Sequence, residues 1–261
     1  MAQRVPLRRV PLRRVPLRRL GLWYGLAAIV LKPLTFLFTR PDWRGTEHVP
    51  PTGGVILAVN HISHADPIVL ADYVVYGTGR IARFMAKSTL FHVRPLVGRV
   101  MRGAAQIPVY RQTADASLAL RDAVAALHAG ECVVIYPEGT VSRDPGKWPM
   151  TAKTGTARLA LLSGAPVVPV GQWGAQDILD TYRSPGLHLL PRHAVTLLAG
   201  PTVDLSAYRG RELTAEVLRG ASEEIMRGIT ALVVELRGES APAAVFDYRA
   251  ARPELPARRS A

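Results

Sequence analysis

The stretch Val55–Pro67 reads VILAVNHISHADP, an apolar run of five residues followed by a short segment rich in polar groups. Further short apolar runs follow it at Ala105–Val109, Cys132–Tyr136, Val167–Val170 and Val195–Leu198. Such runs predict β-strands, and the segments between them have apolar residues near helical spacing: Pro67–Tyr76, Asp115–Ala129 and Thr154–Ser163. Strands that alternate with helices predict an α/β fold with a mainly parallel central sheet flanked by helices. Functional side chains should then gather at the strand ends.

The length of 261 residues predicts one catalytic domain with an appendage at each end. We expect a basic tail over residues 1–20, a membrane-anchoring segment over 21–40, the catalytic domain over 41–240 and a flexible C-terminal tail over 241–261. The catalytic domain should end with an amphipathic helix at about Thr214–Arg237. The single cysteine, Cys132, lies in an apolar run and is expected in the core rather than as a nucleophile.

The N-terminal tail contains the hexapeptide RVPLRR three times, at Arg4–Arg9, Arg9–Arg14 and Arg14–Arg19. Its seven arginines leave a charge of +6 for the rest of the chain, out of a net charge of +13 (13 − 7). A proline at every fifth position predicts an extended, solvated conformation. Such a tail suits an anionic membrane surface. We expect no specific nucleic acid as a partner, because the body has neither zinc-finger spacing nor a clear RNA-binding motif.

An uncharged stretch, Leu20–Leu31, follows the tail, and Lys32–Pro33 separates it from a second apolar piece, Leu34–Phe38. The first stretch has 12 residues, fewer than the ~20 that span a bilayer as a helix. No small-residue cleavage site follows, so a signal peptide is disfavoured. We expect a helical segment in the membrane interface with Trp23 and Tyr24 at headgroup depth, on the cytoplasmic face of the cell membrane. A helix packed on the domain remains the alternative.

Several common catalytic motifs are absent from the sequence. There is no GxSxG nucleophile elbow and no GxxxxGK[ST] phosphate-binding loop. The segment Gly77–Ala82 matches GxGxxA, but no acidic residue follows before Asp115 to bind a ribose, so we interpret it as a turn.

The polar segment NHISHADP permits two chemical interpretations. His61, His64 and Asp66 could ligate zinc, with His92 as a fourth ligand, but the HxxHxD spacing matches no common zinc motif, so we expect no metal. Alternatively, His61 and Asp66 form an acid–base pair, which requires a turn or helix entry to bring them together. The carboxylate would then fix the imidazole tautomer and make His61 a general base near neutral pH.

A second polar segment, YPEGTVS at Tyr136–Ser142, follows another predicted strand. Its Pro-Glu-Gly-Thr turn offers a carboxylate, free backbone amides and a hydroxyl group at one strand end. Basic residues surround it in the sequence: Arg111, Arg143, Lys147 and Lys153. Cations and free amides near a catalytic base suit an acceptor that carries a phosphate.

Together these segments resemble the glycerolipid acyltransferase family that includes 1-acylglycerol-3-phosphate acyltransferases (PlsC-like proteins). NHISHAD is similar to the family's NHxxxxD block, and YPEGTVS is similar to its FPEGTxS block. The stretch from Lys87 to Arg111 resembles the second block, and Val167–Val170 resembles the fourth. Tyr136 replaces the usual Phe, and Val141 stands where the family often has an arginine, which leaves one phosphate contact in doubt.

The resemblance implies direct transfer of a fatty acyl group to the free hydroxyl of lysophosphatidic acid, giving phosphatidic acid. His61 would be the base and Asp66 its orienting acid. The implied phosphate-binding set is Arg111, Glu138, Gly139, Thr140 and Lys153, and the implied supporting residues are Asn60, Lys87 and Pro169. The acyl donor would be acyl-CoA or acyl carrier protein, and no cofactor is expected.

Three alternatives stay open at this point. A related acyltransferase could use another lysophospholipid or a glycolipid as acceptor. A metal-dependent hydrolase would use His61, His64 and Asp66 as ligands. A non-catalytic membrane-surface binding protein would need only the basic tail and the apolar segment.

Overall fold

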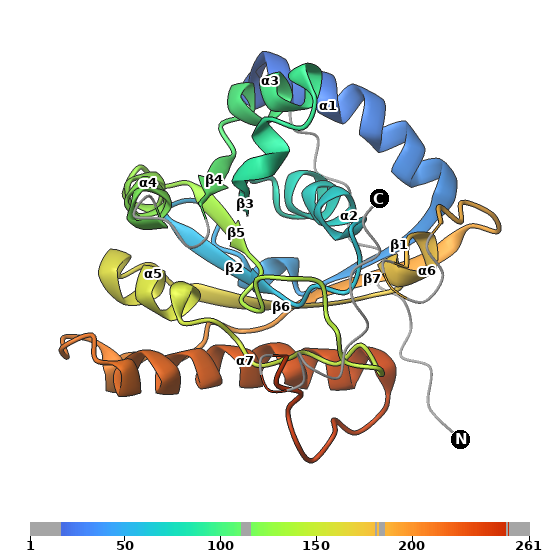
Figure 1. Cartoon of the computed structure of the whole chain (residues 1–261). Coiled ribbons are helices and arrows are strands. Elements are labelled where there is room, and N and C mark those ends of the chain that lie inside the picture. Colours follow the sequence, from blue (N-terminus) through green and yellow to red (C-terminus); the bar gives the residue numbers. More distant parts are fainter. Residues whose placement is uncertain (1–16, 111–115, 181, 183–185, 249, 251–261) are drawn as a thin grey trace.

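The computed structural model describes residues 17–110, 116–180, 182, 186–248 and 250 (Figure 1). They form an α/β fold in which helices cover both faces of one seven-stranded sheet. The strands are β1 (Thr39–Arg44), β2 (Val55–Val59), β3 (Ala82–Lys87), β4 (Ile107–Val109), β5 (Cys132–Ile135), β6 (Val167–Trp173) and β7 (His193–Ala199). Their order is β1-β7-β6-β2-β5-β3-β4, and every neighbouring pair is parallel except β6 with β7. The predicted α/β class with a mainly parallel sheet is confirmed.

The helices divide between the two faces of the sheet (Figure 1). The α-helices are α1 (Leu17–Phe38), α2 (Asp66–Asp72), α3 (Pro95–Gly103), α4 (Ala116–His128), α5 (Gly155–Ser163), α6 (Ala175–Ile178) and α7 (Ala215–Arg237). Short helical turns are η1 (Thr46–His48), η2 (Tyr73–Thr78), η3 (Ser88–Phe91) and η4 (Ser206–Tyr208), of which η2 is a π-helix that continues α2. Helices α4, α5 and α7 cover one face, and α1, α2 and α3 lie on the other.

Strand β2 lies in the middle of the sheet and contributes to both hydrophobic cores. Ile56 and Ala58 pack with residues of α4, α5 and α7, while Leu57 and Val59 pack with residues of α2 and α6. Every residue of β2 is completely buried. This double burial explains why the sequence VILAV shows no alternation of apolar and polar residues. The strand ends at the centre of the molecule, so the polar segment after it begins in a rigid, dry setting.

Two strands, β1 and β3, were not predicted. Only the first residue of TRPDWR in β1 and the first residue of ARFMAK in β3 are fully buried. Partly buried strands carry mixed sequences, so neither shows the continuous apolar run that identified β2. Gly79, at the end of η2, has a φ of 78°, which agrees with the predicted turn in this segment. Cys132 is buried in β5, as expected for a core residue.

Helix α1 begins at Leu17, directly after the last proline of the repeat, so residues 17–20, expected in an extended tail, are helical. Gly21, with a φ of 71°, kinks the chain after this first turn. The helix ends at Phe38, two residues before the end of the predicted membrane-anchoring segment. Residues 1–16 lie outside the described residues. The helix also continues through Pro33, which joins the two apolar pieces. The resulting segment Gly21–Phe38 has 18 residues and a mean hydropathy of 1.5, and by length and composition it is long enough to cross a membrane.

One side of α1 packs on the catalytic domain. Tyr24 and Ala28 are buried there against η2. The hydroxyl of Thr35 donates to the carboxylate of Asp72, and the ammonium of Lys32 lies 3.9 Å from the ring centroid of Tyr76. Only 17% of the apolar segment is buried, however, so most of its surface faces away from the protein.

The segment after α7 returns to the catalytic domain. The backbone N–H of Thr151 donates to the carbonyl of Phe246 over 3.1 Å, and its hydroxyl donates to the same oxygen. A flexible tail over all of 241–261 was predicted because the composition is rich in Pro, Ala and Arg. In the part that the structure describes, these hydrogen bonds tie Phe246 to Thr151, and the flexibility of the tail stays a prediction. Residues 251–261 lie outside the described residues.

Candidate active site

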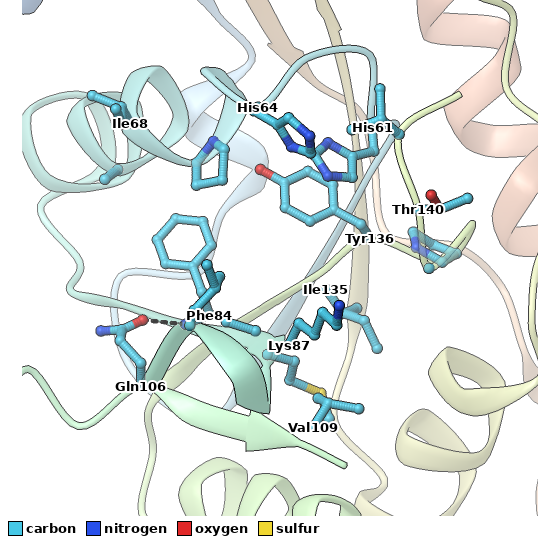
Figure 2. Close-up of a pocket in the computed structure, with 18 of the residues that line it drawn as sticks. His61, His64, Ile68, Phe84, Lys87, Gln106, Val109, Ile135, Tyr136 and Thr140 are labelled. Atoms are coloured by element: carbon cyan, nitrogen blue, oxygen red, sulfur yellow. Dashed lines mark hydrogen bonds between the residues drawn. The ribbon is translucent and has the colours of Figure 1, made fainter. Parts of the chain in front are cut away.

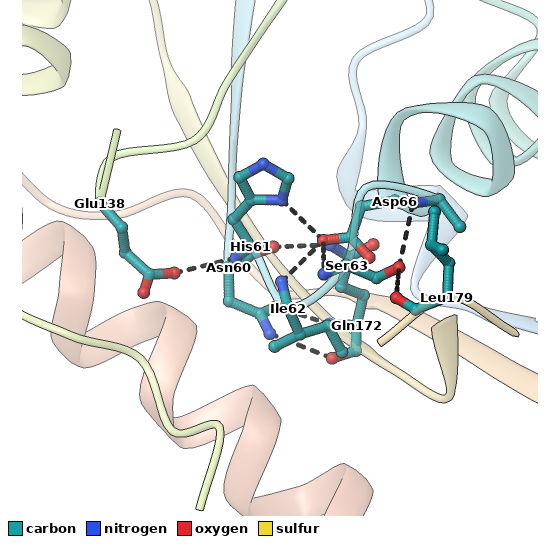
Figure 3. Close-up of polar contacts among 9 residues, drawn as sticks. Asn60, His61, Ile62, Ser63, Asp66, Glu138, Gln172 and Leu179 are labelled. Carbon is teal, nitrogen blue, oxygen red and sulfur yellow. Dashed lines mark hydrogen bonds and ion pairs between the residues drawn. The ribbon is translucent and has the colours of Figure 1, made fainter. Parts of the chain in front are cut away.

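The candidate site begins where β2 ends, with a polar clamp between neighbouring strands (Figure 3). The side-chain amide of Asn60 donates to the carbonyl of Gln172 in β6 over 3.1 Å, and its oxygen accepts the backbone N–H of Gln172 over 2.8 Å. The side chain of Gln172 in turn donates to the carbonyl of Asn60 over 2.6 Å. Both residues are fully buried. This clamp fixes the backbone from which His61 projects, which fits the supporting role predicted for Asn60.

The turn after Asn60 brings His61 and Asp66 together. Nδ1 of His61 lies 2.7 Å from Oδ2 of Asp66, which also accepts the backbone N–H groups of Ile62 over 2.7 Å and Ser63 over 2.9 Å (Figure 3). Asp66 is the first residue of α2 and is completely buried. Three donors on one oxygen hold the carboxylate in place and aimed at the ring. Nδ1 therefore carries the proton, and Nε2 keeps the lone pair that a general base needs.

Tyr136 fixes the plane of the His61 ring. The two rings stack with centroids 4.2 Å apart and an interplanar angle of 20° (Figure 2). Ring stacking and the bond to Asp66 together restrict both side-chain torsions of His61. From the sequence, Tyr136 is only a departure from the usual Phe. Its stacking contact with His61 could not be predicted, because residues 75 apart in the sequence give no local signal of a contact.

Glu138 also holds His61, although in a different way from that predicted. It is 3% exposed, and its carboxylate accepts the backbone N–H of His61 over 2.8 Å and that of Met150 over 3.1 Å. Its predicted phosphate-binding role does not fit this placement, because the carboxyl group is buried and both of its oxygens are engaged by backbone amides. Glu138 instead ties the base to the loop after β5.

Burial raises the pKa of Glu138 to about 8 from 4.5, although the two amide donors oppose this shift. Because the pKa is raised in the folded state, the protonated form of Glu138 stabilises the folded protein relative to the ionised form. This contribution to the free energy of unfolding is complete below about pH 4.5 and is lost as the pH rises toward about 8. Glu138→Gln replaces one acceptor by an amide group and should cost about 1–3 kcal/mol of stability at pH 5. The difference in melting temperature from the wild type should narrow between pH 5 and pH 8, about the window set by those two pKa values.

Thermal unfolding followed by circular dichroism at several pH values measures this difference. Glu212→Gln is the matched control, because Glu212 is exposed and its melting temperature should track the wild type. A gap between the Glu138→Gln variant and the wild type that stays constant from pH 5 to pH 8 would contradict the raised pKa.

Three of the other predicted phosphate-binding residues lie beside the pair formed by His61 and Asp66, which is called the dyad below. Gly139, Thr140 and Lys153 line one groove with His61. Gly139 has a φ of 69°, in the left-handed region that favours glycine, and a Cβ there would lie 3.1 Å from the side chain of Lys153. Arg111 lies outside the described residues.

The predicted supporting residues lie in different places. Lys87, at the end of β3, is exposed and lines the groove (Figure 2). Pro169 is buried within β6, where its carbonyl accepts the backbone N–H of Gly200 over 2.9 Å. Pro169 therefore supports the sheet rather than the groove.

His64 lies next to the pair formed by His61 and Asp66. Its ring is exposed, and its centroid lies 6.3 Å from that of His61 in an edge-on arrangement. In the part of the chain that the structure describes, no group of three His, Cys, Asp or Glu side chains is arranged to hold a metal ion.

The groove beside His61 has a volume of about 2730 Å³ and two kinds of lining. Apolar residues come from α1, η2 and β3, among them Tyr24, Tyr76 and Phe84. Cationic residues come from the loop after β5 and from α5: Arg143, Lys147, Lys153 and Arg158. A drug-sized ligand occupies roughly 300–1,000 Å³. The groove can therefore hold more than one such group, including a long apolar one and an anionic one.

A buried aspartate at the start of α2 that orients a histidine beside such a groove is an arrangement suited to acid–base chemistry. The model of the acyltransferase family matches residues 40–173, just over half of the chain, and contains the whole dyad. The chain belongs to this acyltransferase family.

Named relatives agree with this assignment. A chloroplastic 1-acyl-sn-glycerol-3-phosphate acyltransferase of Brassica napus is 29% identical over 55% of this chain and 40% of its own length. The enzyme of the same name from Borreliella burgdorferi is 29% identical over 66% of each chain. These matches cover less than two thirds of either relative. The crystal structure of the 1-acyl-sn-glycerophosphate acyltransferase PlsC from Thermotoga maritima superimposes with a TM-score of 0.61 at 28% identity, over 84% of this chain and 82% of that one.

Proposed function

We propose that this protein transfers a fatty acyl group from acyl-CoA or acyl carrier protein to the free hydroxyl of lysophosphatidic acid, giving phosphatidic acid. The observation that carries the proposal is the His61–Asp66 pair, which opens on a groove with both apolar and cationic lining. The relatives are named for acylation of the same acceptor. A lysolipid presents a hydroxyl, an apolar chain and a phosphate, and the groove offers a group for each.

In the proposed reaction, Nε2 of His61 removes the proton of the acceptor hydroxyl as its oxygen attacks the thioester carbonyl. A C–O bond forms, the C–S bond breaks, and the proton held by His61 is available to the thiolate. A thiol with a pKa of about 8.5 leaves readily, so no covalent enzyme intermediate is needed. Burial raises the pKa of Cys132 to about 12, which removes the chain's one thiol as a nucleophile. No metal or organic cofactor enters this scheme.

The membrane surface is the proposed location of the reaction. Helix α1 presents apolar side chains outward, and α3 beside it does the same with Leu96 and Val97. The ring of Trp23 packs where a side chain at Gly103 would have to lie, so the two helices form one continuous surface. Tyr24 and Ala28 of α1 line the groove on the inner side of this surface. A substrate held in the bilayer could therefore enter the groove beside α1.

The test is acyl transfer from labelled palmitoyl-CoA and oleoyl-CoA to lysophosphatidic acid in mixed micelles that contain EDTA. Phosphatidic acid should form in the presence of the chelator, because the proposed base needs no metal. Lysophosphatidylcholine and other lysophospholipids, tested in parallel, address the alternative acceptors. Loss of product on adding EDTA, with recovery on adding zinc, would favour the metal-dependent alternative. No transfer to any acceptor, either from these acyl-CoAs or from acyl carrier protein loaded with the same chains, would overturn the proposal.

A further inference from the structure

Arg143 lies against two tyrosine rings beside the groove. Its guanidinium carbon is 4.2 Å from the ring centroid of Tyr182 and 5.3 Å from that of Tyr248. All three residues line the groove that His61 also lines. They come from three separate parts of the chain: the loop after β5, the segment after α6 and the segment that returns after α7. Such an arrangement fixes an otherwise flexible side chain in one orientation.

The guanidinium of Arg143 keeps unused hydrogen-bonding capacity. Its Nε is buried and has no hydrogen-bond partner among the described residues. None of the ion pairs that these residues form includes Arg143. Lys147, four positions along the same loop, differs, because its ammonium lies 3.0 Å from the carboxylate of Asp180. A buried N–H without an acceptor is costly, and the guanidinium as a whole would gain charge-assisted hydrogen bonds from an anion in the groove.

The backbone of Arg143 is held close to the dyad. The preceding residue, Ser142, donates its N–H to the carbonyl of His61 over 2.6 Å. The N–H of Arg143 itself lies 3.0 Å from the sulfur of Met150, whose own N–H is bound by Glu138. Val141, in contrast, is 2% exposed and contributes no charge to the groove. The loop thus presents its cation two residues later than the family's FPEGTxS block does when it carries an arginine at position 141.

We propose that Arg143, held by its contacts with Tyr182 and Tyr248, binds a phosphate group of a substrate. This inference rests on the proposed function and deepens it, because it names the residue that recognises the anionic group. The phosphate could belong to the acceptor or to coenzyme A. The bond between Ser142 and His61 favours the acceptor, since its hydroxyl must reach Nε2 of His61 while its phosphate is held nearby.

Steady-state kinetics of Arg143→Gln should separate the two sources. If the acceptor supplies the phosphate, its KM should rise at least about tenfold with little change in kcat, because ground-state binding is lost. If coenzyme A supplies it, the KM for acyl-CoA should rise instead. Arg143→Lys keeps the charge but not the planar fork and should give a smaller rise. Arg219→Ala is the matched control, since Arg219 is an exposed cation on α7 outside the groove. Unchanged KM values for both substrates would overturn the inference.

Direct binding keeps this inference separate from the proposed function. Isothermal titration calorimetry with glycerol 3-phosphate and with coenzyme A needs no turnover, so it reports on the phosphate site even in a protein that transfers no acyl group. The wild type should bind one of these probes, and Arg143→Gln should bind it at least about tenfold more weakly. Equal affinity of wild type and variant, or no binding of either probe to the wild type at millimolar concentration, would overturn it. Tyr248→Ala should also weaken binding of that probe, because one of the two tyrosine rings that contact Arg143 is lost.

Discussion

Replacing His61 by alanine should lower the rate of acyl transfer to lysophosphatidic acid by roughly 10²–10⁴-fold, the usual contribution of a general base. Among the described residues, His61 is the only one with a titratable side chain that both bonds to Asp66 and lines the groove. In the proposed reaction, removal of the ring would leave the acceptor hydroxyl without its base. The loss should fall on kcat, because the proton is transferred only in the transition state. The measurement is product formation from labelled oleoyl-CoA under saturating acceptor.

The matched control for this variant is His92→Ala. His92 is exposed in the segment between η3 and α3, outside the groove lining, so its loss should leave the rate unchanged. Circular dichroism should show that both variants stay folded, since His61 lies on the groove surface and its backbone bonds to Glu138 and Ser142 do not need the ring. A folded His61→Ala protein that retains wild-type turnover would refute the base assignment.

The dyad could be predicted from sequence because its members are close together in the chain. His61 and Asp66 are five residues apart, and a single turn before α2 suffices to join them. The central strand β2 was likewise visible, since burial on both faces leaves an uninterrupted apolar run. Signals of this kind are local. They can be recognised without the tertiary structure, because the reacting residues and the turn that joins them lie in one short segment.

The parts that sequence reasoning missed depend on contacts between distant segments. Glu138 stands in a polar turn and looks available to a ligand, yet its carboxylate is buried against the amides of His61 and Met150. Tyr248 lies in a stretch of tail-like composition, yet it closes over Arg143. Composition reports the average environment of a segment and cannot reveal which of its residues find a partner elsewhere. In the structure, Glu138, which was predicted to bind phosphate, has a structural role instead. Tyr248, which was predicted to lie in a flexible tail, contacts Arg143.

The outer face of α1 is the other feature whose energetic consequence is large. Leu22 is 71% exposed and Ile29 is 55% exposed. They are seven residues apart on the helix, so they share one face, and Tyr24 and Ala28 pack on the opposite side. Exposure of large apolar side chains in a row is costly in water and favourable in a bilayer interface. We therefore expect this face, rather than the whole helix, to determine binding to lipid.

The double variant Leu22→Glu/Ile29→Glu should lower binding to phosphatidylglycerol-containing vesicles by about 100-fold or more. Each side chain contributes roughly 1.5–3 kcal/mol when buried in an apolar environment, and each added carboxylate is repelled by anionic lipid. Deletion of the helix would be a poorer test, because it would also uncover Tyr76 and the groove. The matched control is Leu118→Glu/Leu162→Glu, which adds the same charges at exposed positions of α4 and α5. Sedimentation with vesicles measures the difference, and equal binding of the two double variants would show that charge alone, without the apolar face, holds the protein at the membrane.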